Sequence, residues 1–173
     1  MTPEQGDATG QVVPADTQES SSKVVLRAEE LAFVRRQPYK TFEYLIEVYL
    51  KDTNAYGNVY FSRHFEWQGI LREAWFSKCI FKNMLELPGV FITKRAGIEY
   101  VAEVNPFSQI IGFLNTKNFK NASFDLTFEF RSAIDNRIMS FGTQTIVFAD
   151  LAKKPCRIPS EIMQMMKAYE RPI

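Results

Sequence analysis

Residues 62–81 form the least polar stretch of the chain and predict its central element. Their apolar side chains fall on nearly every side of a helix, interrupted mainly by Glu66, Arg72 and Glu73. A polar segment precedes them, and its Asp, Asn and Gly residues are the types that turn a backbone and start a helix. Because a helix that is apolar nearly all round must be covered nearly all round, we expect a buried helix that begins near Ser62.

Alternating apolar and polar residues on both sides of this helix predict a sheet. Residues 40–50 alternate before the loop, and the sequence ELPG at 86–89 breaks the pattern after the helix. Four long β segments follow, at 90–104, 107–119, 122–132 and 137–149. Turn residues separate them at Asn105–Pro106, Lys120–Asn121 and Asp135–Asn136. The spacing predicts an antiparallel meander of neighbouring strands.

The sequences at the two ends of the chain predict only a disordered segment and short helices. Residues 1–24 are rich in Gly, Ser, Thr, Gln and Asp, so we expect a disordered segment, followed by one domain over 25–173. Residues 26–37 have a weak amphipathic pattern, and Pro38 ends the short peripheral helix that it predicts. Pro159 and Ser160 start a short C-terminal helix. The predicted class is therefore α+β, with one antiparallel sheet curled round one long helix.

The composition of the chain argues against several classes of partner and site. The formal net charge is +1, with 21 basic and 20 acidic residues, so no global field attracts nucleic acid or an anionic membrane. The two cysteines, Cys79 and Cys156, have neither CxxC nor Cys/His spacing, which argues against a disulfide framework or a zinc site. No apolar segment is long enough to span a membrane or resembles a signal peptide. We expect a soluble, cytoplasmic protein without metal or cofactor.

The loop and helix together resemble a known family. Residues 52–76, DTNAYGNVYFSRHFEWQGILREAWF, are similar to the D-T-D-x-x-G-x-V-(Y/F) signature of hot-dog-fold thioesterases of the 4-hydroxybenzoyl-CoA thioesterase type. Residues 91–110 look like the first long strand after the helix in that family. The resemblance covers most of residues 40–165 and implies a hot-dog fold that hydrolyses acyl thioesters.

One departure from the signature changes the expected chemistry. Asn54 occupies the position of the second Asp, where many relatives carry the catalytic carboxylate, and an amide cannot act as nucleophile or general base. The combination of TNxxGNVYF with WQGxxRE looks most like thioesterases associated with enediyne and polyene polyketide synthases. That resemblance implies a site built on Asn54 and Arg72 that releases a β-ketoacyl chain from an acyl carrier protein. The product could then lose carbon dioxide.

Several backbone and side-chain groups near the loop could take part. Amides near Gly57, Asn58 and Val59 could hold the oxyanion of thioester hydrolysis, since amides at a helix start are unpaired; alternatively, Gly57 simply permits the turn. Asn54 could orient water and substrate, or only cap the turn. Arg72, amid apolar neighbours, needs either a carboxylate partner or a substrate group.

Other residues of the stretch have both a functional and a structural interpretation. His64 could be a general base if it faces the thioester, or a satisfied structural group. Glu66 and Glu73 could replace the missing loop carboxylate or form an exposed salt-bridging edge. From the resemblance we expect substrate contacts from these two residues and from Tyr60, Phe61 and Trp67.

Alternative functions remain open on the sequence alone. An acyl-CoA thioesterase of broad specificity fits the same residues, and so does an acyl- or polyketide-binding protein that has lost its catalytic carboxylate. A dehydratase would need a His and a carboxylate facing across a dimer, which His64 with Glu66 or Glu73 could supply. Because hot-dog folds pair through their sheets and exposed sheet edges need cover, we expect a dimer or tetramer, with Thr93 to Gly97 of a partner near the site.

Overall fold

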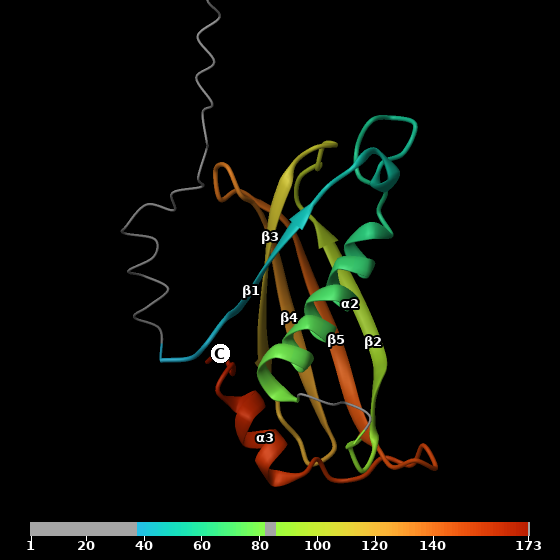
Figure 1. Ribbon diagram of the computed structural model, residues 1–173, viewed down its shortest axis with the longest axis vertical. Coiled ribbons are helices and arrows are strands. Elements are labelled where there is room, and N and C mark those ends of the chain that lie inside the picture. The colour runs from blue at the N-terminus through green and yellow to red at the C-terminus, as the bar shows by residue number, and fades with distance from the viewer. Residues whose placement is uncertain (1–37, 82–85, 173) are drawn as a thin grey trace, which may run out of the picture.

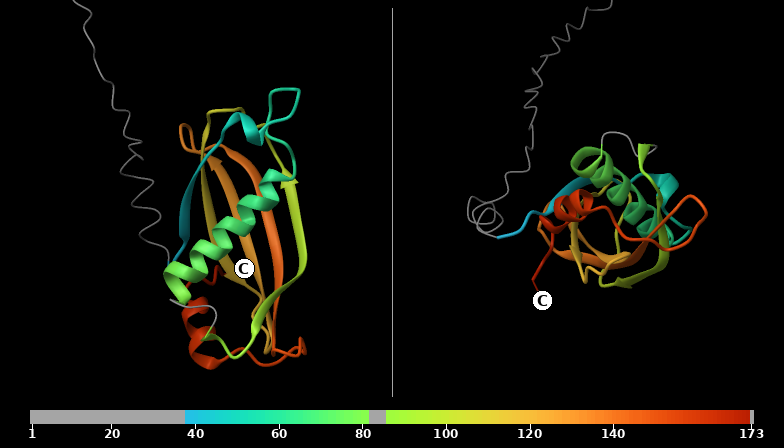
Figure 2. Two further views of the ribbon diagram at one scale, coloured as in Figure 1. Left: turned by 45° about the vertical axis from the view of Figure 1, so that its right-hand side comes forward. Right: turned by 90° about the horizontal axis from the view of Figure 1, so that it is seen from below.

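One curled antiparallel sheet lies against one long helix. The computed structural model describes residues 38–81 and 86–172. The strands are β1 (Phe42–Glu47), β2 (Val90–Tyr100), β3 (Gln109–Lys117), β4 (Ser123–Ser132) and β5 (Ile138–Ala149). Helix α2 (Arg63–Trp75) ends in the π-helical turn η2 (Phe76–Ile80), and α3 (Ser160–Lys167) follows the last strand. Helix α2 runs diagonally across the hollow side of the sheet (Figures 1 and 2). The predicted α+β class is confirmed.

The order of the strands differs from the predicted meander. The sheet order is β1-β3-β4-β5-β2, so β3, β4 and β5 are consecutive neighbours but β2 pairs with β5 and β1 pairs with β3. The chain from β2 to β3 therefore crosses the end of the sheet, where the amide of Phe107 donates to the carbonyl of Val48 at 2.8 Å. The predicted turn between neighbours at Asn105–Pro106 is wrong, because turn residues specify a change of direction and not the strand that pairs next.

The alternation in β4 places its large apolar side chains in the core, as predicted. Phe124, Leu126, Phe128 and Phe130 are at most 1% exposed, and they face the helix side chains Leu71 and Trp75, which are fully buried. Gly112 on β3 allows this close packing, because a Cβ there would lie 2.5 Å from Leu71 Cδ2.

The sheet covers α2 on one side only. The buried side chains of the helix are His64, Trp67, Gln68, Leu71 and Trp75. On the opposite side Phe65 and Ile70 are 37% and 44% exposed. The expectation of cover nearly all round is wrong for the single chain, because a sheet of five strands curls round only part of the helix.

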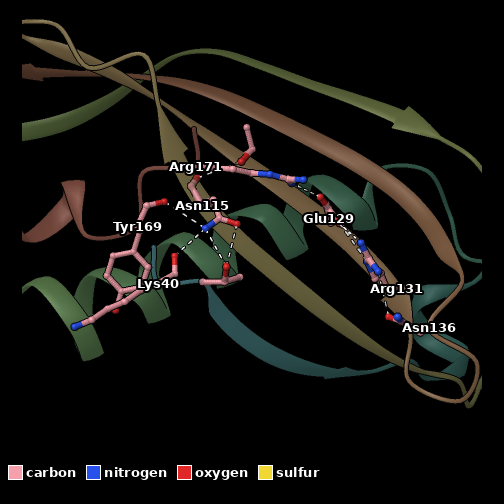
Figure 3. A network of polar contacts seen from close by, with 9 residues as sticks. Lys40, Asn115, Glu129, Arg131, Asn136, Tyr169 and Arg171 are labelled. Atoms are coloured by element: carbon pink, nitrogen blue, oxygen red, sulfur yellow. Dashed lines mark hydrogen bonds and ion pairs between the residues drawn. The ribbon is translucent and has the colours of Figure 1, made fainter. Parts of the chain in front are cut away.

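The C-terminal residues extend the sheet beyond the end of β1. The amide of Thr116 on β3 donates to Tyr169 O, and the amide of Arg171 donates to Thr116 O, each at 3.0 Å. The Arg171 guanidinium then reaches Glu129 at 2.7 Å, and Arg131 holds the same carboxylate at 2.6 Å (Figure 3). Burial by itself raises the pKa of Glu129, but the hydrogen bonds and charges of the two arginines outweigh burial and hold that pKa below its usual value of 4.5.

Replacing Glu129 by Gln is expected to lower the unfolding free energy by about 1–2 kcal/mol near neutral pH, because the negative partner of Arg131 and Arg171 is lost and their hydrogen bonds to it are weakened or broken. A depressed carboxyl pKa stabilises the fold above the unfolded pKa, and this contribution disappears as the pH falls through the folded pKa. Urea unfolding should therefore show a difference between wild type and Glu129→Gln that shrinks below about pH 4. Glu161→Gln, which changes an exposed acid on α3, is the control. An undiminished difference at acid pH would contradict the assignment.

The remaining predictions on secondary structure divide into two groups. The C-terminal helix is confirmed, with Pro159 as its N-cap. The proposed disorder over 1–24 and the helix over 26–37 lie outside the described residues. Within the described part of the chain, no helix is both long and apolar enough to cross a membrane.

Candidate functional site

The loop before α2 is closed on itself by hydrogen bonds. The Asn54 amide donates to Asn58 O at 2.9 Å, and the Gly57 amide donates back to Asn54 O at 3.1 Å. Asn54 Oδ1 accepts from the Tyr56 amide at 2.8 Å, so its side chain caps the turn. Gly57 has a φ of 82°, in the left-handed region that favours glycine. The structural roles considered for Asn54 and Gly57 are thus both present.

The loop leaves few donors for an oxyanion. The Gly57 amide is engaged within the turn, and the Val59 amide donates to Val104 O at 2.8 Å. Among the described residues, no hydrogen bond engages the Asn58 amide or the Nδ2 group of Asn54. Of the three predicted backbone donors, only Asn58 therefore keeps an amide available to a ligand, and Asn54 offers its Nδ2.

Arg63 fastens the loop to the start of the helix. Its Nη1 bonds both carboxylate oxygens of Glu66, at 2.8 and 2.6 Å, and its Nη2 donates to Lys51 O at 3.1 Å. Its Nε lies 3.7 Å from Asp52 Oδ1. Glu66 is therefore committed to an exposed ion pair, as the structural alternative proposed.

His64 lies in the core at the N-terminal end of α2. It is 3% exposed, and its Nδ1 is 2.9 Å from Ser140 Oγ on β5. The rings of Trp67 and Tyr100 lie 4.5 and 5.1 Å from its own. Burial lowers the pKa of His64 from 6.5 to about 4, so the imidazole is neutral near pH 7.

Arg72 lies two turns further along the helix, beside edge strand β2. Its Nη1 donates to Thr93 Oγ1 on β2 at 2.6 Å and to Gln144 Oε1 on β5 at 3.1 Å. Its Nη2 is 3.6 Å from Glu73, whose side chain is 71% exposed and therefore binds weakly. Glu43 and Glu47 on β1, two carboxylates that the sequence also offered as partners, form no ion pair with it in the described part of the chain. Nη1 is therefore anchored by two hydrogen bonds. Apart from Glu73, no group in the described part of the chain pairs with Nε or Nη2.

A row of buried polar groups continues from Arg72 between α2 and the sheet. Gln144 Nε2 donates to Gln68 Oε1 at 3.1 Å, and Gln68 Nε2 donates to the Gly97 carbonyl of β2 at 3.0 Å. Sequence reasoning missed both glutamines. The signal was present in the spacing, because His64, Gln68 and Arg72 recur every four residues and so share one face of a helix.

The other predicted residues are dispersed. Tyr60 and Phe61 are 45% and 56% exposed with their ring centroids 4.6 Å apart, whereas Trp67 is 4% exposed and packs against Phe130. Asn54 and Arg72 are not in contact within one chain. Arg72 lies nine residues beyond the start of α2, which corresponds to about 13 Å along the helix axis.

The outer face of the sheet carries a separate hollow. It has a volume of about 580 Å³ and is lined by side chains that point away from α2, among them Lys117, Glu129, Thr143 and Arg171. Figure 3 shows two of these, Glu129 and Arg171, joined to each other on that face. The hollow is therefore not part of the Arg72 site. Across the described residues, no group of three or more His, Cys, Asp or Glu side chains could hold a metal ion.

Comparison with known proteins places this geometry in a family. The model of the thioesterase-like superfamily matches residues 48–166, from the end of β1 through most of α3. The chain belongs to the thioesterase-like superfamily. This membership supports thioester hydrolysis as the reaction class, and the fold is the hot-dog fold of thioesterases. A search of curated proteins gives no match.

Solved structures of low sequence identity share the fold. A 1,4-dihydroxy-2-naphthoyl-CoA thioesterase from Synechocystis is 20% identical with a TM-score of 0.68, over 76% of this chain and 99% of its own. The dynemicin thioesterase, whose structures describe polyene binding, is 20% identical with a TM-score of 0.70, over 78% of this chain and 100% of its own. A Staphylococcus aureus protein solved with CoA is 10% identical with a TM-score of 0.72, over 79% and 90%. The first of these proteins is named for a naphthoyl-CoA thioester, the structures of the second describe polyene binding, and the third was solved with CoA, so the shared fold alone does not select a substrate.

Proposed function

We propose that this protein hydrolyses the thioester of a β-ketoacyl or related polyketide chain on an acyl carrier protein and releases the free acid. The observation that carries the proposal is the half-anchored guanidinium of Arg72. Its Nη1 is held by Thr93 and Gln144, which leaves the Nε and Nη2 edge for a substrate. The similarity of fold to the dynemicin thioesterase supports the polyketide class.

The shape of the available edge favours a substrate with two oxygens. An arginine presents Nε and Nη2 as two parallel N–H donors, which match two acceptor oxygens side by side. A β-ketoacyl thioester has such a pair in its thioester carbonyl and its 3-oxo group. A simple acyl thioester has only one of them. Arg72 would therefore bind the β-ketoacyl chain through both donors.

The reaction needs no covalent intermediate with the protein. Water adds to the thioester carbonyl carbon, negative charge develops on the carbonyl oxygen, and the C–S bond then breaks to give acid and thiol. The proton lost by the water ends on the leaving sulfur. Arg72 stabilises the developing oxyanion, and Asn54 Nδ2 with the Asn58 amide supplies neutral donors. A β-keto acid formed in this way can lose carbon dioxide without further help from the protein.

The proposal is tested by assaying the protein with matched thioesters of one chain length. β-Ketoacyl, simple acyl and 3-hydroxyacyl chains are each presented on an acyl carrier protein and on CoA, and free thiol and acid are measured. We expect the fastest release from the β-ketoacyl carrier protein. Equal rates on CoA thioesters would favour a broad acyl-CoA thioesterase instead. Tight binding without thiol release would indicate a non-catalytic binding protein, and an α,β-unsaturated product would indicate a dehydratase.

We further propose that the site is completed by a second copy of the chain. Strand β2 has 11 residues and is an edge strand, and among residues 38–81 and 86–172 no other strand pairs with its outer side. Exposed edges of this length pair readily with another strand. If two copies pair antiparallel near Ala96, the Tyr100 end of one strand lies beside the Val90 end of the other. The loop of the second copy is tied by the Val59 to Val104 hydrogen bond to the segment that follows its β2, and it then approaches Arg72 of the first copy.

Mixing two inactive variants tests this arrangement. Asn54→Ala and Arg72→Ala are prepared separately, then unfolded and refolded together. If Asn54 and Arg72 act across the interface, half of the dimers contain one intact site, and activity returns to about a quarter of wild type. If both residues act within one chain, every site carries a lesion and the mixture stays inactive. Refolding each variant alone is the control.

A further inference from the structure

We propose that Gln144 and Gln68 are positioning residues that fix the direction in which the Arg72 guanidinium points. This inference rests on the proposed function, since it concerns how the same site is held. The three side chains form one continuous chain of hydrogen bonds from α2 to strands β5 and β2. Neither glutamine is expected to contact the substrate.

Both ends of this chain are chemically fixed, so the amides have only one orientation. At one end the Gly97 carbonyl is an acceptor and requires the Nε2 group of Gln68. Gln68 therefore presents Oε1 to Gln144, and the Nε2 group of Gln144 donates to it. At the other end Arg72 has only donors, and it receives the remaining Oε1 of Gln144. A flipped amide at either glutamine would set two donors or two acceptors against each other.

The chain is built into the interior of the protein. Gln68 is fully buried and Gln144 is 5% exposed, and burying polar groups is costly unless every one is paired. Gly142 on β5 makes the room, because a Cβ at that position would lie 2.6 Å from Gln68 Nε2. The buried space above Gly142, at the centre of α2, is therefore filled by a polar amide and not by an apolar side chain.

The consequence falls on Arg72, whose long side chain is otherwise weakly restrained. With Gln144 in place, Nη1 is held by two acceptors on two different strands, which sets both the position and the plane of the guanidinium. Without Gln144, only Thr93 and the exposed Glu73 remain. The Nε and Nη2 edge would then sample several directions, and the stabilisation of the transition state would weaken.

Kinetics of single and double variants test the proposal. Gln144→Leu is expected to lower kcat about tenfold with KM changed less than about threefold, because the loss of preorganised charge acts on the transition state. Arg72→Ala combined with Gln144→Leu should be no slower than Arg72→Ala alone. Gln144→Glu keeps an acceptor for Arg72 but loses the donor to Gln68 Oε1, so it should retain more of the rate than Gln144→Leu and less than wild type. Gln164→Leu on the exposed face of α3 is the matched control.

The outcomes separate this inference from the proposed function. A tenfold loss that persists in the Arg72→Ala background would overturn the positioning role, since Gln144 would then act independently of Arg72. The second measurement needs no turnover: nitrogen-15 relaxation of the Arg72 Nε–H should show a rigid group in wild type and a mobile one in Gln144→Leu. An equally rigid Arg72 in both proteins overturns the inference even if the wild type proves to be an active thioesterase. If Gln144→Leu fails to fold, Gln68→Met probes the chain from its other end.

Discussion

Replacing Arg72 by alanine is expected to reduce kcat/KM for thioester hydrolysis by about 10²–10³-fold, the usual cost of removing a preorganised oxyanion donor. The basis for this value is the anchored Nη1 together with the Nε and Nη2 edge, which has only the exposed carboxylate of Glu73 beside it. The fold should tolerate the change, because the side chain is at the margin of the core and 23% exposed. Thermal unfolding of the variant provides the check that activity and not folding has been lost.

Arg72→Lys sharpens the same test. Lysine keeps the positive charge but offers a single point donor in place of two parallel N–H groups. The variant should therefore lose more activity on β-ketoacyl than on simple acyl thioesters of equal length. Arg157→Ala, an exposed arginine outside the site, serves as the control. Equal losses on the two substrate classes would count against bidentate binding of the two oxygens.

The unfolding free energy is expected to fall by about 3 kcal/mol between pH 6.5 and pH 4 through His64 alone. The folded protein holds this pKa down to about 4, whereas the unfolded chain titrates near 6.5. Between these values only the unfolded state binds the proton, so stability is complete above pH 6.5 and decreases as the pH falls.

The comparison with His64→Gln isolates this contribution from the carboxylates. Glutamine can still reach Ser140 Oγ but does not titrate, so its stability should depend less on pH across that interval. Urea unfolding of both proteins at closely spaced pH values gives the difference directly. Parallel curves would show that folding does not lower the pKa of His64. The same depressed pKa predicts that His64 contributes no titration to the rate profile above about pH 5.

The elements of the fold could be predicted from local sequence, and their pairing could not. The alternation of Phe124, Leu126, Phe128 and Phe130 specified both the strand and its buried face. The turn at Asn105–Pro106 specified a change of direction, but the choice between a hairpin and a crossing to β3 depends on which sheet edge β2 joins. That choice is a long-range packing effect with no local signature.

The residues of the candidate site likewise include some that could be predicted from local sequence and others that could not. Asn54 and Arg72 could be proposed from a motif, and the structure adds that the side-chain oxygen Oδ1 of Asn54 caps the turn while its Nδ2 stays available. The glutamine chain could not be proposed in full. Gln68 had a readable position one helical turn before Arg72, but Gln144 lies 72 residues from Arg72 in the sequence and becomes its neighbour only through the register of β5.

The crossed strand order also has a consequence for how the molecule folds. Strands β3, β4 and β5 pair through short turns, whereas β1 and β2 join the sheet across much longer separations, from Tyr100 to Ser140 at the nearest pair to Phe42 to Leu114 at the farthest. Because loop closure over long separations slows pairing, the central three strands should form first and the two edges last. Arg72, Thr93 and Gln144 come from the helix, the late edge strand and the early centre. The guanidinium is therefore fixed only when β2 pairs with β5. A folding intermediate without this pairing would have most of its core but no complete Arg72 site.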